Sequence, residues 1–294
     1  MSLHVFGNIL TGYGCAANNR GESEGNITTL QKLLWQGNVH TTVSSEAIRW
    51  ALRYYWQSND LEVNRQWDDQ KDEHVWQDST WKGWADEKGR TYIDDDLLGY
   101  MKAEGAKAEA GDKKGSTLKR RGVLEISRAV STTPYAGDIS FNAKSGTKDR
   151  TSLYGTEIHA TRYQFGFSMT PERLRVKSRC LDALDALGAL GEVAGNHSRY
   201  LYDFSPESIV LRISQDPAPR ILYCFQETDG SLSASDLVRK VEAGDIGKEE
   251  LFIGGPAADF PEIKALGLGG CFAGVKTAFA ACKEAVLAQL KAES

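Results

Sequence analysis

The sequence lacks the residue patterns that metal centres and disulfide frameworks require. Its five cysteines are far apart and form no Cys-x-x-Cys pair, and its five histidines show no His-x-x-x-His or His-Glu-x-x-His spacing. An odd, dispersed set of cysteines is typical of reduced, packed thiols. We therefore expect no metal and no other cofactor.

Signatures of common enzymes and of membrane proteins are also missing. The chain has no Gly-x-Ser-x-Gly elbow, no P-loop and no complete Gly-x-Gly-x-x-Gly fingerprint. It has no apolar run of about 18 residues that would predict a transmembrane helix. The first residues, MSLHVFGNILTGYG, are polar where a signal peptide is apolar. We expect a cytoplasmic protein.

Charge is segregated along the chain. The net charge of −5 argues against a nucleic-acid partner, but residues 57–112 contain 15 acidic and 7 basic residues, whereas the rest contains 28 basic and 25 acidic. Two short runs are strongly basic, namely KKGSTLKRR (113–121) and PERLRVKSR (171–179). The global charge therefore leaves a polyanionic partner open.

Hydrophobic periodicity predicts an α+β fold. It indicates strands over 3–12, 122–131, 157–169, 208–214 and 220–226, and helices over 44–56 and from Pro171 through Leu190. Without insertions the order is βαββαβ, the ferredoxin-like arrangement of RNA-recognition motifs. Such a fold alone does not identify a function.

Two insertions interrupt this order. The first, within 57–121, contains four of the seven tryptophans, which favours a small unit with an aromatic core and leaves base stacking as the alternative. The second, 138–158, has a basic, turn-forming centre, KSGTKDR, and favours a projecting hairpin. The remaining segments, 1–56, 122–137 and 159–294, then form the main body and a C-terminal extension.

The predicted helix over 44–56 carries a candidate phosphate site. Ser44 and Ser45 stand at its start, where hydroxyls and free backbone N–H groups favour an anion. Arg49 and Arg53 follow one turn apart on one face, and the helix has no carboxylate after Glu46. Spacing alone leaves phosphate binding on one side, and a solvated basic stripe or an ion pair on the other, equally open.

Several motifs resemble one protein family. The stretches NNRGESEGNITTLQ (18–31) and VSSEAIRWALR (43–53) resemble the start of the backbone subunit of type I CRISPR effector (Cascade) complexes. The stretches AVSTTPYAGDISFNAKS (129–145), TEIHATRYQFGFSM (156–169) and AGNHSRYLYDFSPESIVLR (194–212) resemble its DevR-like, subtype I-B branch. The resemblance covers residues 3–214 in the correct order.

The resemblance implies a hand-shaped, non-catalytic RNA-binding subunit. It has a ferredoxin-like palm, helical fingers formed by the first insertion and a thumb formed by the 138–158 hairpin. Copies stack head to tail along a CRISPR RNA, beside other Cascade subunits, and present the guide to a target DNA strand. The thumb reaches over a neighbouring copy and displaces one base at regular intervals.

The candidate RNA-binding residues are cationic, polar or at the predicted thumb. They are Asn18, Asn19, Arg20, Ser44, Ser45, Arg49, Arg53, Arg128, Phe141, Lys144, Lys148, Arg150 and Arg162. Phe141, with Leu153 and Tyr154, would either lie against a displaced base or pack the hairpin onto its own domain. We expect Phe165 and Phe167 to belong to the core.

Two alternative functions remain open from sequence. The run YIDDDLLG (92–99) supplies adjacent carboxylates that could hold Mg²⁺ in a ribonuclease of the related type III kind, although acidic runs are more often solvated. A nucleic-acid-binding regulator is the other alternative, without a helix-turn-helix pattern to support it.

Overall fold

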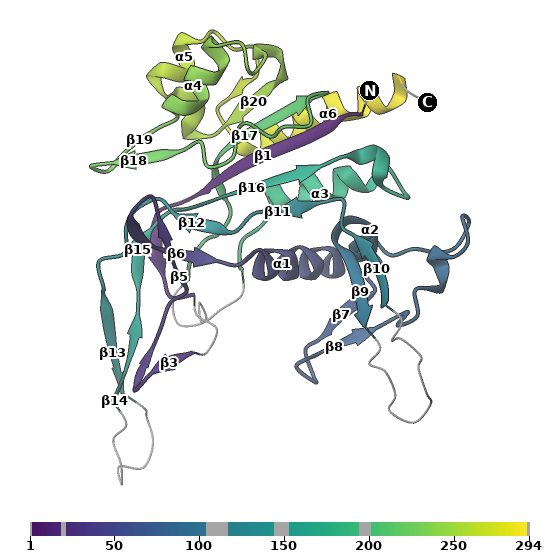
Figure 1. The fold of residues 1–294 in the computed structure, drawn as a ribbon, viewed down its shortest axis with the longest axis horizontal. Helices are drawn as coiled ribbons and strands as arrows, with labels where there is room; N and C mark the ends of the chain where they lie inside the picture. The colour runs from purple at the N-terminus through teal and green to yellow at the C-terminus, as the bar shows by residue number, and fades with distance from the viewer. Residues whose placement is uncertain (1, 19–21, 104–116, 144–152, 194–200, 293–294) are drawn as a thin grey trace.

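The computed structural model describes residues 2–18, 22–103, 117–143, 153–193 and 201–292. In these ranges the chain has the expected mixed α+β fold, in which a nine-stranded sheet has helices on both faces (Figure 1). None of the described helices is both long and apolar enough to cross a membrane.

Strand β1 (His4–Thr11) lies in the middle of the large sheet. It pairs antiparallel with β16 (Tyr163–Met169) on one side and with β17 (Pro206–Ser214) on the other. Every residue of β1 after His4 is buried, which explains why its sequence is apolar on both faces. The other strands of the sheet are β12 (Ala129–Ser131), β6 (Asn38–Val43) and β5 (Lys32–Trp35) beyond β16, β20 (Leu251–Gly254) and β21 (Cys271–Phe272) beyond β17, and β11 (Glu125–Ile126), which also pairs with β16.

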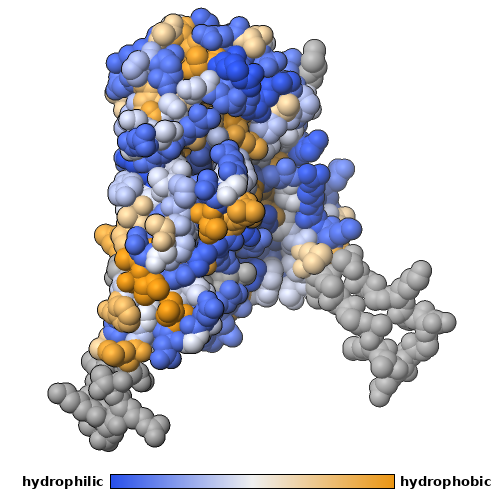
Figure 2. Space-filling model, turned by 60° about the vertical axis from the view of Figure 1, so that its left-hand side comes forward, coloured by the Kyte–Doolittle hydropathy of each residue, from blue (hydrophilic) through white to orange (hydrophobic). Residues whose placement is uncertain are grey.

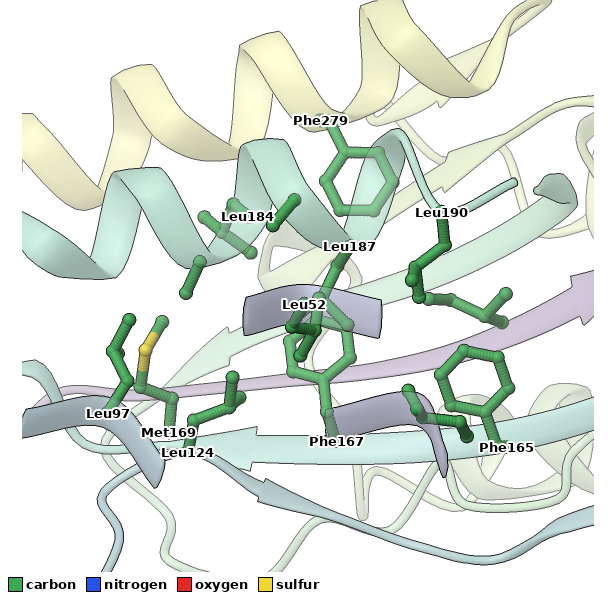
Figure 3. Packing of buried hydrophobic residues seen from close by; sticks show 14 of the residues in the cluster. Leu52, Leu97, Leu124, Phe165, Phe167, Met169, Leu184, Leu187, Leu190 and Phe279 are labelled. Carbon is green, nitrogen blue, oxygen red and sulfur yellow. The ribbon is translucent and has the colours of Figure 1, made fainter. Parts of the chain in front are cut away.

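Three helices cover one face of this sheet. They are α1 (Ser45–Ser58), α3 (Arg179–Gly188) and α6 (Val275–Ala292), and α3 contacts the other two. Figure 3 shows Leu184 and Leu187 of α3 between Phe279 of α6 and Phe167 of β16. Phe165 and Phe167 are both buried, so the prediction that they belong to the core is confirmed. Burying such a side chain stabilises the fold by roughly 1.5 to 3 kcal/mol.

The C-terminal part covers the opposite face. Phe6 and Leu10 of β1 pack there against α4 (Ser235–Glu242) and α5 (Pro261–Ala265). The hairpin formed by β18 (Gln226–Thr228) and β19 (Ser231–Ser233) precedes these helices. The sheet is therefore a central layer between two hydrophobic clusters.

In its described residues, 57–103 and 117–121, the insertion is not the helical unit that the resemblance implies. These residues form two hairpins, β7 (Arg65–Asp68) with β8 (Glu73–Trp76) and β9 (Gly99–Ala103) with β10 (Thr117–Arg121), and one short helix, α2 (Ile93–Leu98). A 3-10 turn (Lys82–Trp84) lies between them. Trp81 packs against Trp76 and Tyr100 with ring centroids 5.3 and 4.6 Å away, so aromatic side chains form much of its interior.

The predicted 138–158 hairpin has two described arms, β13 (Ile139–Ala143) and β14 (Leu153–Glu157). The N-terminal loop adds two strands to their sheet, β3 (Ser23–Glu24) and β4 (Ile27–Thr28), and β4 pairs parallel with β14. Nearby, β2 (Gly14–Ala16) pairs with β15 (His159–Thr161). Figure 1 shows the hairpin and the 57–121 insertion projecting from the same side of the molecule, at opposite ends of α1.

The helix predicted from Pro171 is wrong in its first part. Pro171–Arg173 form a single 3-10 turn, and α3 begins only at Arg179. The carboxylate of Asp96 accepts hydrogen bonds from the backbone N–H groups of Arg175 and Val176, at 2.9 and 3.1 Å. These two N–H groups therefore donate to a side chain that is distant in the sequence and not to the carbonyls of a helix.

The strand predicted over 220–226 is also wrong. Residues 220–225 form a turn and a loop on the sheet, and only Gln226 enters a strand, β18. The side chain of Gln164 donates to the carbonyl of Phe225 at 2.8 Å and accepts from its N–H at 3.2 Å. These bonds occupy backbone groups of Phe225 that a neighbouring strand would use.

Candidate nucleic-acid interface

Helix α1 begins as its sequence predicts. The hydroxyl of Ser44 caps the helix and accepts a hydrogen bond from the N–H of Ala47 at 3.2 Å, and Glu46 lies in the first turn. The buried face of the helix consists of Ile48, Ala51, Leu52 and Trp56. This burial fixes which of the remaining side chains can face outward.

Ser45, Arg49 and Arg53 follow one another at intervals of four residues, so they form one stripe along α1. At 1.5 Å per residue the stripe is about 12 Å long. Figure 1 shows that α1 runs from the side of the β13–β14 hairpin to the side of the 57–121 insertion. The stripe therefore extends between the two projecting parts of the molecule.

A further cation, Arg128, lies at the N-terminal end of α1. Its guanidinium donates to Gln31 and to Thr42, both at 3.3 Å. The pKa of Glu46 is lowered, chiefly by a backbone N–H hydrogen bond and also by the Ser44 and Ser45 hydroxyls and the charge of Arg128. The structure thus brings Arg128 to the end of α1 that carries Ser45.

At the other end of the stripe lies an arginine-rich pocket of about 420 Å³, called the α1 pocket below. Arg49 and Arg53 of α1 line it together with Arg65 and Arg120 of the insertion, and Asp94 and Asp95 of α2 also belong to the lining. The Nε atoms of Arg53, Arg65 and Arg120 are buried, and none has a hydrogen-bond partner in the part of the chain that the structure describes. Four guanidinium groups against two carboxylates leave the lining with a net positive charge, which favours an oxyanion such as a phosphate.

Burial lowers the pKa values of Arg49 and Arg53, the two arginines of α1. It lowers the pKa of Arg53 to about 10, against the opposing effect of Asp94, whose carboxylate lies 3.6 Å from its Nε. Burial also lowers the pKa of Arg49, which donates a hydrogen bond to the carbonyl of Leu98. A pKa of about 10 still leaves Arg53 cationic at neutral pH.

The backbone at Gly99 shapes this pocket. Gly99 has φ of +70°, a left-handed conformation that favours glycine, and a Cβ there would lie 2.4 Å from the carbonyl oxygen of Arg120. Glycine at this position lets the end of β10 pack closely against the start of β9, directly after α2. Arg120 is thereby brought opposite the arginines of α1.

The three aspartates of α2 are buried; Asp94 and Asp95 accept hydrogen bonds within the insertion, and Asp94 and Asp96 also pair with Arg53 and Arg179 of the main body. Asp94 accepts from the N–H groups of Asn64 and Arg65, and Asp95 accepts from the side chains of Asn64 and Trp81. Asp96 forms ion pairs with Arg120 and Arg179 at 3.0 and 2.9 Å. Their oxygens are occupied by protein donors, which contradicts both a solvated acidic run and an open Mg²⁺ site at this place.

Not every predicted contact residue joins the stripe. Arg162 is held by Glu207 and Glu227 at 3.1 and 3.5 Å and lies over the ring of Tyr13, so its charge is compensated within the protein. Asn18 is buried. The other predicted residues of the loop and the hairpin tip, Asn19, Arg20, Lys144, Lys148 and Arg150, lie outside the described residues.

The arms of the hairpin expose apolar side chains. Phe141 is 83% exposed and Leu153 is 60% exposed, so neither packs the hairpin onto its own domain. Phe141 pairs with Gly155 and Leu153 with Ala143 across the two strands, which places both side chains on one face. Figure 2 shows hydrophobic surface above the grey end of the hairpin.

Two arginines of the α1 pocket, Arg65 and Arg120, were not predicted from the sequence as contact residues. Arg120 belongs to the basic run 113–121, which was noted only as a charge feature, and Arg65 stands in a strongly acidic segment. Their place beside α1 depends on α2 and the two hairpins of the insertion. Only the tertiary structure reveals it.

Comparisons with known proteins agree with this architecture. Residues 13–223 match the family model described as CRISPR-associated negative auto-regulator DevR/Csa2. The CRISPR-associated protein Cas7/Cst2/DevR of Myxococcus xanthus (strain DK1622) is 52% identical over an alignment of 271 residues that covers 88% of each chain.

Two solved structures share the fold. A chain of a CRISPR RNA-guided surveillance complex in a pre-nicking state superposes with a TM-score of 0.61 at 11% identity, covering 96% of this chain and all of that one. A chain of another CRISPR RNA-guided surveillance complex gives a TM-score of 0.59 at 12% identity, covering 96% and 99%. Given the family match and the identity to the Myxococcus protein, the chain belongs to the DevR/Csa2 family of CRISPR-associated Cas7 proteins.

Proposed function

We propose that this chain is the non-catalytic backbone subunit of a type I CRISPR effector complex of the I-B branch. It binds the backbone of a guide RNA, stacks head to tail with further copies along that RNA beside other Cascade subunits, and leaves most guide bases free to pair with a target DNA strand. The proposal draws on the family membership and on the surveillance-complex chains that share its fold.

The observation that carries the proposal is the stripe of Ser45, Arg49 and Arg53 leading into the α1 pocket. Phosphate contacts position a strand without reading its sequence, which suits a subunit that must accept any guide. The guanidinium groups of Arg49, Arg53, Arg65 and Arg120 in the pocket lining supply directed hydrogen bonds in addition to charge.

The hand-shaped organisation belongs to the same proposal. The central strands follow the order β17-β1-β16-β12, and α1 and α3 connect them in the chain order βαββαβ. We assign this unit to the ferredoxin-like palm. The 57–121 insertion is then the fingers, built of hairpins, and the β13–β14 hairpin is the thumb, with Phe141 as the candidate side chain beside a displaced base.

Replacing Arg49 and Arg53 by alanine tests the palm contacts. If both hold phosphates, affinity for RNA falls about equally for all guide sequences, and the slope of log K against log salt concentration falls by about 1.4, because each single-strand phosphate contact contributes about 0.7. The control replaces Lys276 and Lys291, two exposed lysines of α6, by alanine. Unchanged affinity and slope in the arginine variant would contradict the proposal.

A second variant separates RNA binding from folding, since Arg53 also pairs with Asp94. Ser45→Glu adds a carboxylate to the first turn of α1, which favours the helix but repels a phosphate. We expect an unchanged or higher Tm and RNA binding weakened by about tenfold or more. The matched control is Thr277→Glu in the first turn of α6, which should bind RNA normally.

A further inference from the structure

A second pocket, of about 520 Å³, opens beside the α1 pocket and is strongly basic. Its lining contains five cations, Lys119, Arg120, Arg121, Arg173 and Arg175, and no carboxylate. The first three come from the basic run 113–121 and the other two from the run 171–179. Two charge features far apart in the sequence therefore meet in one place, which we call the second basic pocket.

Two of these arginines are fixed in position by the protein. Arg120 pairs with Asp96 at 3.0 Å, and Arg175 donates to the backbone carbonyls of Asp86 and Glu87 at 2.8 and 2.9 Å. Their guanidinium groups lie over the ring of Trp84, with the Cζ atoms 4.1 and 5.0 Å from its centroid. The electron-rich face of the Trp84 ring attracts both guanidinium groups by cation–π interactions.

The other cations are more accessible. Lys119 and Arg173 are exposed, and neither forms an ion pair with a residue of the described ranges. Arg121 pairs with Glu125, but its side chain is 80% exposed. Lys119 and Arg173 are thus the side chains that an arriving anion can contact without breaking an ion pair within the described structure.

The two pockets adjoin each other. Tyr100, Arg120 and Gly122 line both, so Arg120 stands at their junction. A strand whose phosphates occupy the α1 pocket can pass Arg120 and continue without leaving basic surface. Openness to solvent and several separate cations suit successive phosphates of a polymer better than one enclosed anion.

We propose that the second basic pocket binds the next phosphates of the same RNA strand, with Lys119 and Arg173 as the contacting residues and Arg120 shared between the pockets. This inference rests on the proposed function of α1, and it extends the RNA path from the stripe of Ser45, Arg49 and Arg53 onto the far side of β10.

The test is the full-length variant Lys119→Ala/Arg173→Ala, measured for binding of guide RNA over a range of salt concentrations. Loss of two phosphate contacts should lower the salt slope by about 1.4 and weaken binding by about tenfold at low salt. The matched control, Lys276→Ala/Lys291→Ala, removes the same charge from α6 and should behave as the wild type. Unchanged thermal unfolding is expected, because both replaced side chains are exposed.

Comparison with the Arg49→Ala/Arg53→Ala variant separates the two proposals. Normal RNA binding by Lys119→Ala/Arg173→Ala, together with weak binding by the α1 variant, would overturn the second pocket and leave the proposed function standing. Normal RNA binding by both variants would overturn both. Normal guide binding with weakened binding of duplex DNA to the RNA-loaded protein would assign the second pocket to another strand and so overturn the inference.

Discussion

Asp95 gives the molecule a pH dependence at the scale of a single residue. Its pKa is raised to about 6, chiefly by burial and then by the neighbouring charge of Asp94, whereas hydrogen bonds from Trp81 and Asn64 oppose the shift. The folded state therefore holds this proton more tightly than the unfolded chain. The resulting stabilisation is complete below about pH 4 and is lost as the pH rises through about 6.

Asp95→Asn removes this titration. We expect the free energy of unfolding of the variant to change less than that of the wild type between pH 4 and pH 7, by roughly 2 to 3 kcal/mol for a shift of about two pKa units. Denaturant titrations at several pH values measure the difference, with the exposed Asp69→Asn as control. Parallel stability curves for Asp95→Asn and the wild type would contradict the assignment.

Asp96 has a different role, because both oxygens of its carboxylate accept hydrogen bonds from arginine side chains and from backbone N–H groups. It pairs with Arg120 and Arg179 and accepts from the N–H groups of Arg175 and Val176. Asp96→Ala leaves two guanidiniums without their buried partner and should lower the free energy of unfolding by roughly 3 to 5 kcal/mol. Denaturation of Asp96→Ala beside Asp69→Ala measures this, and equal stability of the two variants would refute it.

At the scale of secondary structure, the thumb prediction depends on which strands hold the hairpin. Gly155 and Thr156 of β14 pair with Ile27 and Thr28 of β4, so the base of the hairpin belongs to a sheet of four strands. Replacing residues 142–152 by a two-residue turn should therefore leave the subunit folded. Each arm of five residues spans about 17 Å, and Phe141 lies about 7 Å along β13 from Ile139.

The shortened protein should lose the regular, periodic protection of a long RNA while keeping much of its affinity as a single subunit. Nuclease footprinting on an assembled RNA reads the period, and Phe141→Ser tests the exposed aromatic ring alone. An unchanged periodic footprint after shortening would mean that the hairpin is not the thumb.

Local patterns predicted those elements whose stability is local. The Ser44 cap, the buried face of α1 and the apolar strand β1 could all be recognised along the sequence. The predictions failed where a distant side chain captures the backbone, as Asp96 does at Arg175 and Gln164 does at Phe225. No periodicity within a segment carries that information.

The candidate site, too, could be predicted from the sequence only where local spacing determines it. Arg49 and Arg53 stand on a helix with a clear period, so their common face followed from spacing. Arg65 and Arg120 reach them only because α2 is anchored by buried aspartates and Gly99 turns the chain. Arg162 is a cation within a predicted strand and was therefore a candidate for RNA contact. The carboxylates that compensate its charge, Glu207 and Glu227, come from elsewhere in the chain.

The whole molecule should bind RNA without cutting it. In the proposed function the guide RNA is bound and not cleaved, and the carboxylates of the α2 aspartates accept hydrogen bonds from donors within the protein. The purified full chain should leave both guide RNA and guide paired with target DNA intact in the presence of Mg²⁺. Gel analysis with end-labelled RNA checks this, and cleavage that co-purifies with the intact chain through successive columns would contradict it.

The central position of β1 also affects how the protein is made. This strand is synthesised well before its two partners, which are formed by residues 163–169 and 206–214. At about 5 to 20 residues per second, β17 follows roughly 10 to 40 s later. Through that interval a strand that is apolar on both faces has no native neighbour, and other nascent chains or chaperones compete for it. We therefore expect the yield of folded subunit to depend on translation speed and chaperone supply as well as on the stability of the finished sheet.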